Sequence, residues 1–318
     1  MEFGIVGLGK MGTNLALQAV GKGIRVVGFD PGIDSGREEE LRNEGVELSA
    51  AIKGLMELLR PPRTVFLYVP AGPTVDQVLR ELVALLDEGD IVLDGGNSHF
   101  RDSQARQRRL ARHGIGYVDC GTSGGLEGAR QGACFMVGGE VDVVKVVEPV
   151  LKALAVPGGY THVGKPGAGH FAKLVHNGIE FGMLQAIGEG FALLRKSEYE
   201  IDIAALFHTW AYGSVIRGWL VELMARGLRE RQKEGMANVS SYVEDTGEVN
   251  WLIEEALRME VPIPVISESV MALFRSRDED SAAAKAVAVL RHEFGGHPFG
   301  RAEAVARERR LGQVGLRE

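Results

Sequence analysis

The sequence predicts an α/β domain built on a parallel β-sheet, followed by an all-α domain. Short apolar runs alternate with helical stretches from residue 1 to about residue 163. The first run leads directly into a glycine-rich loop, Gly7–Gly12. After residues 164–167, which read Gly-Lys-Pro-Gly, the sequence keeps a helical period to about residue 293. Alternating strands and helices form a parallel sheet with helices on its faces, and the helical remainder forms a separate layer.

Six apolar runs in the first part are predicted to be strands. They are Phe3–Val6, Arg25–Phe29, Thr64–Val69, Ile91–Leu93, Tyr117–Asp119 and Phe135–Val137. Two of them lead into turn sequences, Val69-Pro-Ala-Gly-Pro73 and Asp94-Gly-Gly-Asn-Ser98. Because α/β sheets bind ligands outside the carboxyl ends of their strands, these turns are candidate ligand contacts.

The length and composition indicate a two-domain globular protein. A chain of 318 residues exceeds what one hydrophobic core usually serves, so we expect domains at residues 1–163 and 164–318. The net charge of −7, without a long basic run, argues against nucleic-acid and membrane partners. No apolar run approaches a membrane span and no secretory signal is recognisable, so a cytoplasmic location is expected. Cys120 and Cys134 provide no metal-ligand spacing, and no metal site is predicted.

The glycine-rich loop lies between the first predicted strand and the helical pattern Asn14–Val20. Gly7 and Gly9 allow a tight turn and close approach to a pyrophosphate, and Gly12 allows close packing of helix on strand. The helix N-terminus adds free N–H groups and a positive dipole. We therefore predict a Rossmann-type dinucleotide site. Its residues are Gly7, Leu8, Gly9, Lys10, Met11 and Gly12, together with Asp30, Val69 and Asn97.

Asp30 lies eighteen residues after Gly12, at the end of the second predicted strand. A carboxylate there accepts hydrogen bonds from a ribose 2′-hydroxyl and repels a 2′-phosphate. The segment Pro31–Asp34 contains no Arg or Lys, so NAD is favoured over NADP. The alternative is that Asp30 merely begins a turn before proline and glycine.

A second pattern lies in the segment Gly169–Glu180. On a helix, Lys173, His176, Asn177 and Glu180 follow i, i+3, i+4, i+7 spacing and share one face. The opposite face carries Phe171, Val175, Ile179 and Ala186, and we expect it to be buried. Gly178 and Gly182 allow a neighbouring element to approach closely. A solvated face is the alternative, but His-Asn between a Lys and a Glu favours a functional site.

Four segments together resemble the decarboxylating 6-phosphogluconate dehydrogenase family. They are Gly7–Gly12, Gly95–Ser98, Gly121–Ala129 and Gly169–Glu180. The likeness spans nearly the whole chain. The chain resembles the short branch of the family, whose helical domain is smaller than that of the long, typically NADP-using enzymes. The wider β-hydroxyacid dehydrogenase superfamily shares the glycine loop, a Ser-Gly-Gly segment and the lysine, but lacks the His and Glu at these spacings.

The resemblance implies NAD-dependent oxidation of the C3 hydroxyl of 6-phosphogluconate, loss of C1 as CO2, and tautomerisation to ribulose 5-phosphate. Lys173 would take the hydroxyl proton if its pKa is lowered, and its ammonium would then polarise the C3 ketone. Glu180 would donate a proton to C1 of the enediol that remains after CO2 has left, if its environment raises its pKa. His176 and Asn177 would orient the hydroxyls between them.

The resemblance implies further substrate contacts. Backbone N–H groups at Gly124 and Gly125, with the Ser123 hydroxyl, would hold the C1 carboxylate, although a plain glycine-rich turn is the alternative. Asn97 resembles the residue between nicotinamide and substrate. Arg291 and His297 resemble an Arg and a His that, in the family, reach into the partner subunit's site. A homodimer whose active sites are completed by the partner's C-terminal segment is therefore expected.

The departures from the family pattern concern the phosphate. Phe181 replaces a Tyr, Leu273 replaces an Arg, and Asn250 replaces a basic residue. Loss of one charge-assisted hydrogen bond typically costs about 1.5 to 3 kcal/mol. Three arginines are candidates to compensate, namely Arg217, Arg275 and Arg277.

Two other functions stay open at this stage. A dehydrogenase of another β-hydroxy acid, phosphorylated or not, would release no CO2 and would not need Glu180. A non-catalytic NAD-binding protein would have no use for an acid and a base on one helix face.

Overall fold

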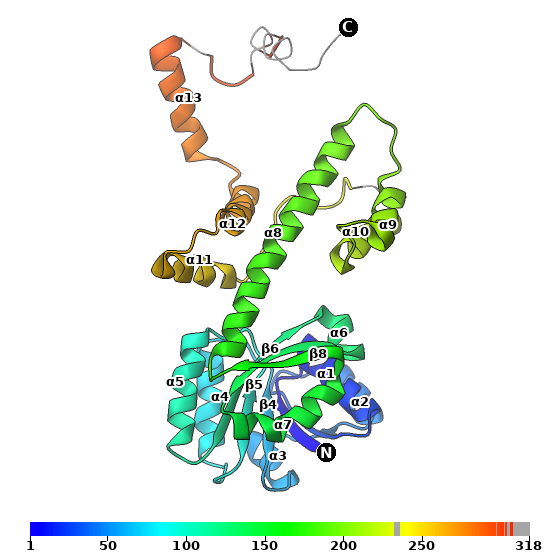
Figure 1. Ribbon diagram of the computed structural model, residues 1–318, viewed down its shortest axis with the longest axis vertical. Coiled ribbons are helices and arrows are strands. Elements are labelled where there is room, and N and C mark those ends of the chain that lie inside the picture. Colours follow the sequence, from blue (N-terminus) through cyan, green and yellow to red (C-terminus); the bar gives the residue numbers. More distant parts are fainter. Residues whose placement is uncertain (232–235, 297, 302, 304–305, 308–318) are drawn as a thin grey trace. The chain divides into compact units, whose positions relative to one another are not determined.

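The protein is described by a computed structural model that covers residues 1–231, 236–296, 298–301, 303 and 306–307 (Figure 1). It contains two compact units. The first comprises Met1–Gly190 and Thr246–Ser267, and the second comprises Phe191–Asp245 and the described residues from Glu268 onward. The predicted domain division at residue 164 stays a prediction.

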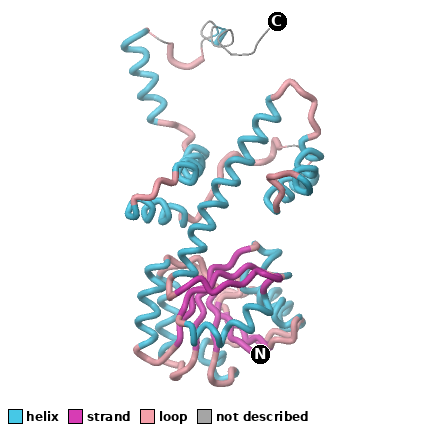
Figure 2. Tube along the Cα trace, in the orientation of Figure 1, coloured by secondary structure: helices cyan, strands magenta, loops and turns pink. Residues whose placement is uncertain are grey.

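The first unit contains an eight-stranded sheet in the order β3-β2-β1-β4-β5-β6-β7-β8 (Figure 2). The strands are β1 (Glu2–Val6), β2 (Arg25–Phe29), β3 (Glu47–Leu48), β4 (Thr64–Leu67), β5 (Ile91–Asp94), β6 (Gly116–Ser123), β7 (Ala133–Gly139) and β8 (Ala155–Gly164). All six predicted strands are present, with ends that differ by a few residues. β3 and β8 were not predicted, because β3 has two residues and β8 begins with a Pro-Gly-Gly stretch instead of an apolar run.

The expected parallel pairing holds for every neighbouring pair from β3 through β6. β7 instead pairs antiparallel with β6, and β8 lies parallel to β7. The connection from β6 to β7 contains only the short helix α6 (Gly125–Gln131). A parallel return needs a crossover of about a dozen residues or more, so this short connection favours the antiparallel pairing.

Helices cover both faces of the sheet. α1 (Lys10–Gly21), α2 (Ser35–Asn43), α6 and α7 (Val141–Leu154) contribute to one hydrophobic core. α3 (Ile52–Leu58), α4 (Pro73–Val83) and α5 (Phe100–Ala111) contribute to the other. Phe3 and Ile5 of β1 lie in the first core and Val6 lies in the second. This alternation follows from the two-residue period of a strand and makes both faces apolar.

After residue 167, the described residues form helices joined by loops, as predicted. The helices are α8 (Ala168–Lys196), α9 (Ile203–Gly213), α10 (Trp219–Glu230), α11 (Glu248–Met259), α12 (Pro264–Arg277) and α13 (Ala282–Gly295). Among the described residues, no helix is both long and apolar enough to cross a membrane. The start of α8 is tied to β6 by the buried Asp119, whose Oδ1 accepts from Gly167 N at 2.7 Å and whose Oδ2 accepts from His170 N at 2.9 Å.

The prediction that the apolar face of α8 is buried was right only in part, because Phe171 packs against Phe100 and Val175 is half-buried, whereas the other two predicted residues are not covered. Ile179 is 53% exposed and Ala186 is also exposed. The packed face instead carries Gly178, where a Cβ would lie 2.3 Å from Leu252 Cδ2 of α11. The glycine therefore permits the close approach that the sequence predicted, but α11 leaves Ile179 and Ala186 exposed.

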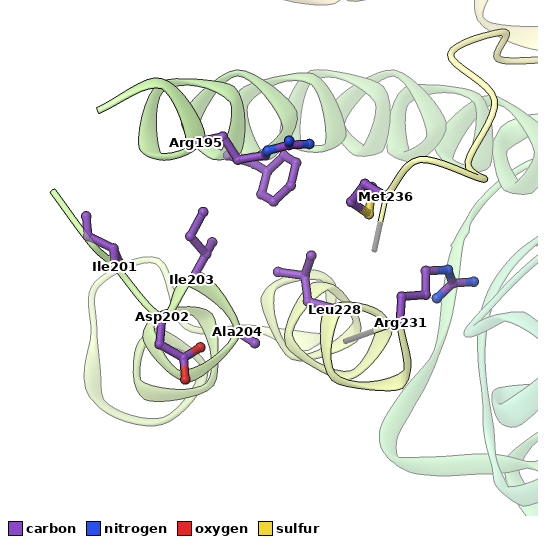
Figure 3. A pocket seen from close by; sticks show the side chains of 9 residues that line it. Arg195, Ile201, Asp202, Ile203, Ala204, Leu228, Arg231 and Met236 are labelled. Atoms are coloured by element: carbon purple, nitrogen blue, oxygen red, sulfur yellow. The ribbon is translucent and has the colours of Figure 1, made fainter. Parts of the chain in front are cut away.

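The second unit contains a cavity of about 280 Å³ formed by the end of α8, α9 and α10 (Figure 3). Figure 3 shows Ile203 and Leu228 pointing toward α8, with Met236 at one side. Apolar side chains dominate the lining, and it includes none of the predicted site residues. This cavity therefore does not belong to the candidate site.

Glu255 joins α11 to α5 within the first unit. Its carboxylate accepts two hydrogen bonds from Arg101 Nη2, at 2.8 and 3.0 Å, and another from Arg258 Nε at 2.7 Å. The hydrogen bonds from Arg258, and then from Arg101, lower the pKa of Glu255 to about 2, although burial acts in the opposite direction. The carboxylate is therefore stabilised by folding.

Glu255→Gln is expected to lower the free energy of unfolding at pH 7 by about 1 kcal/mol, since both arginines are partly exposed and screened by water. The folded-state pKa is depressed, so the stabilisation is present above pH 4.5 and is lost as the pH falls toward 2. Thermal unfolding of both proteins from pH 7 to pH 3 measures this. Glu254→Gln, at the exposed neighbouring residue, is the control, and equal stabilities of all three at pH 7 would contradict the assignment.

Candidate active site

The glycine-rich loop lies at the carboxyl end of β1, where the order of the sheet reverses between β1 and β4. Gly7 has φ +97°, and a Cβ there would lie 2.4 Å from Tyr68 O. A Cβ on Gly12 would lie 1.9 Å from Gly7 O, whereas a Cβ on Gly9 would meet no atom within 4 Å. Gly7 and Gly12 are thus required by packing within the protein, and Gly9 leaves open space on the ligand side of the loop.

Asp30 is held against this loop. Its Oδ2 accepts from Leu8 N at 2.7 Å, and its Oδ1 accepts from Gly32 N at 2.8 Å. Each oxygen keeps a further lone pair for a ribose hydroxyl. Within the loop, α1 begins at Lys10 and Met11, directly after Gly9, and Gly9 has no side chain to cap the helix. Its first N–H groups therefore remain available to an anion.

Two other features near the loop bear on the cofactor. Val69 follows β4, and its Cγ1 would lie 2.9 Å from a Cβ on Gly7, so it borders the loop as predicted. Arg37 was missed by the sequence reasoning, which considered only residues 31–34. Its Nη1 lies 3.4 Å from Leu8 O. The N-cap Asp34, which accepts from Arg37 N at 2.9 Å, could have revealed a helix start that places Arg37 near the loop.

The fully buried Asp94, at the end of β5, holds the turn that carries Asn97 in place through hydrogen bonds. Asp94 Oδ2 accepts hydrogen bonds from Ser98 Oγ at 2.8 Å and from Tyr117 Oη at 3.0 Å. Arg106 Nη1 lies 3.3 Å from the same oxygen and supplies the opposite charge. This network holds both ends of the turn and leaves Asn97 exposed at its tip.

Asn97 Nδ2 donates to Glu248 Oε1 at 2.9 Å, at the start of α11. A carboxylate only accepts, so this contact fixes the orientation of the Asn97 amide and directs its Oδ1 elsewhere. Glu248 Oε2 accepts from Thr246 Oγ1 at 2.5 Å. Glu248 was missed as a site residue, since its proximity to Asn97 depends on the docking of α11.

The polar stripe of α8 converges as predicted. His176 Nδ1 lies 3.5 Å from Lys173 Nζ, 3.2 Å from Asn177 Oδ1 and 3.8 Å from Glu180 Oε2. His176 Nε2 lies 3.0 Å from Ser123 Oγ at the end of β6. The histidine therefore stands at the centre of the group and connects the helix to the sheet.

Ser123 is followed by a turn that only glycine favours. Gly124 has φ +111° and Gly125 has φ +61°, both in the left-handed region. Gly125 begins α6 without a side-chain cap. The structure thus places the predicted Ser-Gly-Gly segment beside His176, whereas its role toward a carboxylate stays a prediction.

Lys173 is the group whose ionisation the structure perturbs in the direction that a base requires. Burial lowers the pKa of Lys173, and the negative charges of Glu180, Cys134 and Glu248 partly oppose this effect. A Cβ on Gly121 would lie 2.5 Å from Lys173 Cβ, so β6 packs directly against the stem of the lysine. Desolvation by β6 and its neighbours disfavours the ammonium form.

A small cavity of about 10 Å³ joins parts of the site. Its lining consists of Asn97, Ser98, His170, Lys173, Leu174, Asn177, Glu248 and Trp251. Three predicted site residues, Asn97, Lys173 and Asn177, therefore share one cavity wall. Arg291 lies in α13, in the second unit, and His297 lies outside the described residues.

The arginines proposed to replace the phosphate donors have other partners. Arg277 bonds to Asp245 Oδ1 at 2.6 Å and to Val243 O at 2.6 Å, and Arg275 is paired with Glu268. Arg217 donates to Ser214 O at 3.3 Å. All three lie in the second unit, and the first two already neutralise carboxylates.

The chain matches two family descriptions in succession. Residues 2–164 match the NAD binding domain of 6-phosphogluconate dehydrogenase, and residues 169–308 match the 6-phosphogluconate dehydrogenase C-terminal domain. The chain is 43% identical over 297 residues to YqeC of Bacillus subtilis (strain 168), covering 93% of this chain and 98% of that protein. The name of YqeC gives 6-phosphogluconate dehydrogenase as a provisional assignment.

A second relative, from Haloferax volcanii, is named 6-phosphogluconate dehydrogenase, NAD(+)-dependent, decarboxylating. It is 38% identical over 302 residues, with 95% of this chain and 99% of that protein covered. The solved structure of Plasmodium falciparum 6-phosphogluconate dehydrogenase matches with a TM-score of 0.79 and 26% identity, over 95% of this chain and 66% of that one. The chain therefore belongs to the 6-phosphogluconate dehydrogenase family of oxidoreductases, with an NAD-binding Rossmann-type domain ahead of a helical domain.

Proposed function

We propose that this chain catalyses the oxidative decarboxylation of 6-phosphogluconate to ribulose 5-phosphate and CO2 with NAD as hydride acceptor. The observation that carries the proposal is the cluster around Lys173. A lysine with a lowered pKa, a histidine bonded to Ser123 and a carboxylate on the same helix face lie together, with the lysine and the carboxylate each within 4 Å of the histidine. Residues 1–163 would bind the cofactor, and residues 164–318 would bind substrate and dimerise.

The residues of the chain would act in three steps. Neutral Lys173 would take the proton of the C3 hydroxyl, and NAD, held by the Gly7–Gly12 loop and Asp30, would supply the hydride acceptor. The resulting ammonium polarises the C3 ketone, which accepts the electron pair released when the C1–C2 bond breaks and CO2 departs. Glu180 then donates a proton to the former C2 of the sugar acid, which becomes C1 of ribulose 5-phosphate, and the enolate oxygen on the former C3 returns to the ketone. His176 and Asn177 orient the hydroxyl groups, and Ser123, Gly124 and Gly125 hold the carboxylate.

The preference for NAD rests on Asp30. Both of its oxygens are fixed by backbone N–H groups, and the carboxylate would accept from a ribose 2′-hydroxyl and repel a 2′-phosphate. The Haloferax relative is named NAD(+)-dependent, which agrees with this assignment. Arg37 is a nearby cation and would weaken the repulsion without removing it.

A second substrate class is favoured by the residues at the phosphate end. Phe181 and Asn250 offer no positive charge, and Arg275 and Arg277 are already paired with carboxylates. Under this alternative, the same Lys173 chemistry would act on a 3-hydroxy acid that lacks the phosphate, with or without decarboxylation. The two substrate classes differ in the distal group and can differ in CO2 release, so a direct comparison of substrates with CO2 capture separates them.

The proposed homodimer rests on α13. None of its residues is buried, although Val287, Leu290 and Phe294 are apolar and are 55%, 63% and 76% exposed. A helix with several exposed apolar side chains, and with no buried residue in the part of the chain that the structure describes, is typical of an oligomer interface. Arg291 lies on this helix, which agrees with the proposal that it completes a partner's site.

The first test is NADH formation with NAD and 6-phosphogluconate, beside unphosphorylated gluconate, with CO2 captured in the same reaction. Equal amounts of NADH and CO2 from the phosphate ester are expected. Lys173→Met should reduce kcat by about 100- to 10,000-fold because the general base is lost. Lys165→Met, in the exposed turn before α8, is the control. NADH without CO2, or turnover of gluconate alone, would favour the second substrate class.

Asp30→Asn is expected to lower the ratio of kcat/KM for NAD to kcat/KM for NADP by about tenfold or more, because one charged acceptor is lost. Steady-state kinetics with both cofactors give this ratio. Asp34→Asn makes the same change of charge four residues later, and there the ratio should stay near that of the unaltered chain. An unchanged ratio in Asp30→Asn would remove Asp30 from cofactor selection.

Light scattering should give a mass twice the 34.4 kDa of one chain. Phe294→Asp should shift the protein toward monomers, since a charge replaces an exposed apolar side chain of α13. Val215→Asp, at a residue that is 99% exposed, serves as the control and should leave the mass unchanged. A monomeric unaltered chain would exclude the dimer.

A further inference from the structure

His170 is a buried titratable residue that the proposed mechanism does not use. It lies in the first turn of α8 and is 2% exposed. Its backbone N–H is bonded to Asp119, and its Nδ1 lies 2.7 Å from Ser103 Oγ of α5. Its Nε2 is buried and, among the described residues, has no hydrogen-bond partner.

The contacts of Ser103 indicate which ring nitrogen carries the proton. Ser103 Oγ also lies 3.3 Å from His99 O, a carbonyl that can only accept. When the hydroxyl proton is donated to that carbonyl, the Ser103 oxygen accepts from Nδ1–H of His170. Nε2 then keeps its lone pair. A buried acceptor without a donor costs free energy, so a donor for Nε2 is expected.

The cavity of about 10 Å³ provides a place for such a donor. His170 and Lys173 both line it, together with Asn97, Asn177 and Glu248. A cavity of this size holds about one water molecule when several polar groups line it. His170 and Lys173 are also three residues apart on α8, which places them on the same face of the helix.

We propose that His170 is a positioning residue for Lys173, and that it acts through one water in this cavity. The Lys173 ammonium donates to the water, and the water donates to Nε2 of His170. Nε2 can accept from the water only when the ring proton is on Nδ1. His170 therefore orients the Lys173 ammonium only in that tautomer. The catalytic meaning of this contact rests on the proposed function, whereas the contact itself does not.

Other charged and titratable groups also act on Lys173. They are Glu180 and His176 from α8, Cys134 from β7, and Glu248 from α11. Around His170 and Ser103, Asp119 and Tyr117 of β6 and His99 before α5 complete the environment. The carboxylates favour the ammonium through charge, whereas His170 would favour it through a directed hydrogen bond. Loss of His170 should therefore lower the Lys173 pKa further.

The test uses the unliganded full-length chain, with ¹⁵N-labelled histidine and ¹³Cε-labelled lysine, in NMR titrations. His170→Gln and Lys173→Arg assign the two signals. A protonated Nδ1 and an unprotonated Nε2 are expected for His170 at neutral pH. In His170→Phe, which lacks an acceptor, the Lys173 titration midpoint should fall by about one pH unit, equivalent to about 1.4 kcal/mol. In His170→Gln, whose amide oxygen accepts, the midpoint should stay near that of the unaltered chain.

A proton on Nε2, or the same Lys173 midpoint in all three proteins, would overturn the proposal. Equal shifts in the Phe and Gln variants would also overturn it, since they would reflect packing alone. If the chain turns over 6-phosphogluconate, the acidic limb of the kcat/KM profile should move down by the same pH unit in His170→Phe. A chain that turns over no sugar acid would refute the proposed function, and the two titrations would still decide the role of His170.

Discussion

The carboxylate of Asp119 is the constraint on which the candidate site depends. It is fully buried, and its two oxygens accept the backbone N–H groups of Gly167 and His170. These donors belong to the first turn of α8, where unpaired N–H groups and the helix dipole favour a negative charge. Because the same carboxylate ends the part of β6 that pairs with β5, the helix can begin at only one place on the sheet. Lys173, one turn later, is thereby set against Gly121.

The neighbouring strand uses the same device. Asp94 of β5 pairs in register with Asp119 of β6, and both are fully buried. Asp94 holds the turn that carries Asn97, whereas Asp119 holds the helix that carries Lys173. Two adjacent carboxylates at the carboxyl edge of one sheet thus position the two segments that meet at the cavity. The strands fix the positions of these segments, whereas the candidate site residues, Asn97 and Lys173, lie in the turn and the helix that the two carboxylates hold.

The sequence predicted the parts of this arrangement that depend on local pattern. The strands, the Gly7–Gly12 loop and the face shared by Lys173 and Glu180 follow from periods of two and 3.6 residues and from glycine spacing. The antiparallel pairing of β7 with β6 was not predicted, because it depends on connection length. The burial of Ile179 and Ala186 on α8 was predicted wrongly, because it depends on how α11 docks. Glu248 comes from a segment whose proximity to the site depends on tertiary docking, so no local pattern indicated it. Arg37 follows the Asp34 N-cap, and His170 lies one turn before Lys173 on the same helix, so local patterns were present for both but were not used. The catalytic and binding roles of the predicted residues stay predictions.

The environment of Lys173 shows how one side chain could serve as base and then as acid. Burial lowers its pKa from 10.5, so folding disfavours the ammonium. That cost is present at pH values below the folded-state pKa and disappears as the pH rises above the unfolded-state value. A fully apolar pocket would make the lysine a base but would leave its ammonium unsupported. Glu180, Glu248 and the lone pair proposed for His170 reduce this cost without removing it. Lys173 can then exist both as the neutral amine and as the ammonium. The proposed mechanism requires both forms, because the lysine takes up a proton in one step and uses the resulting charge in the next.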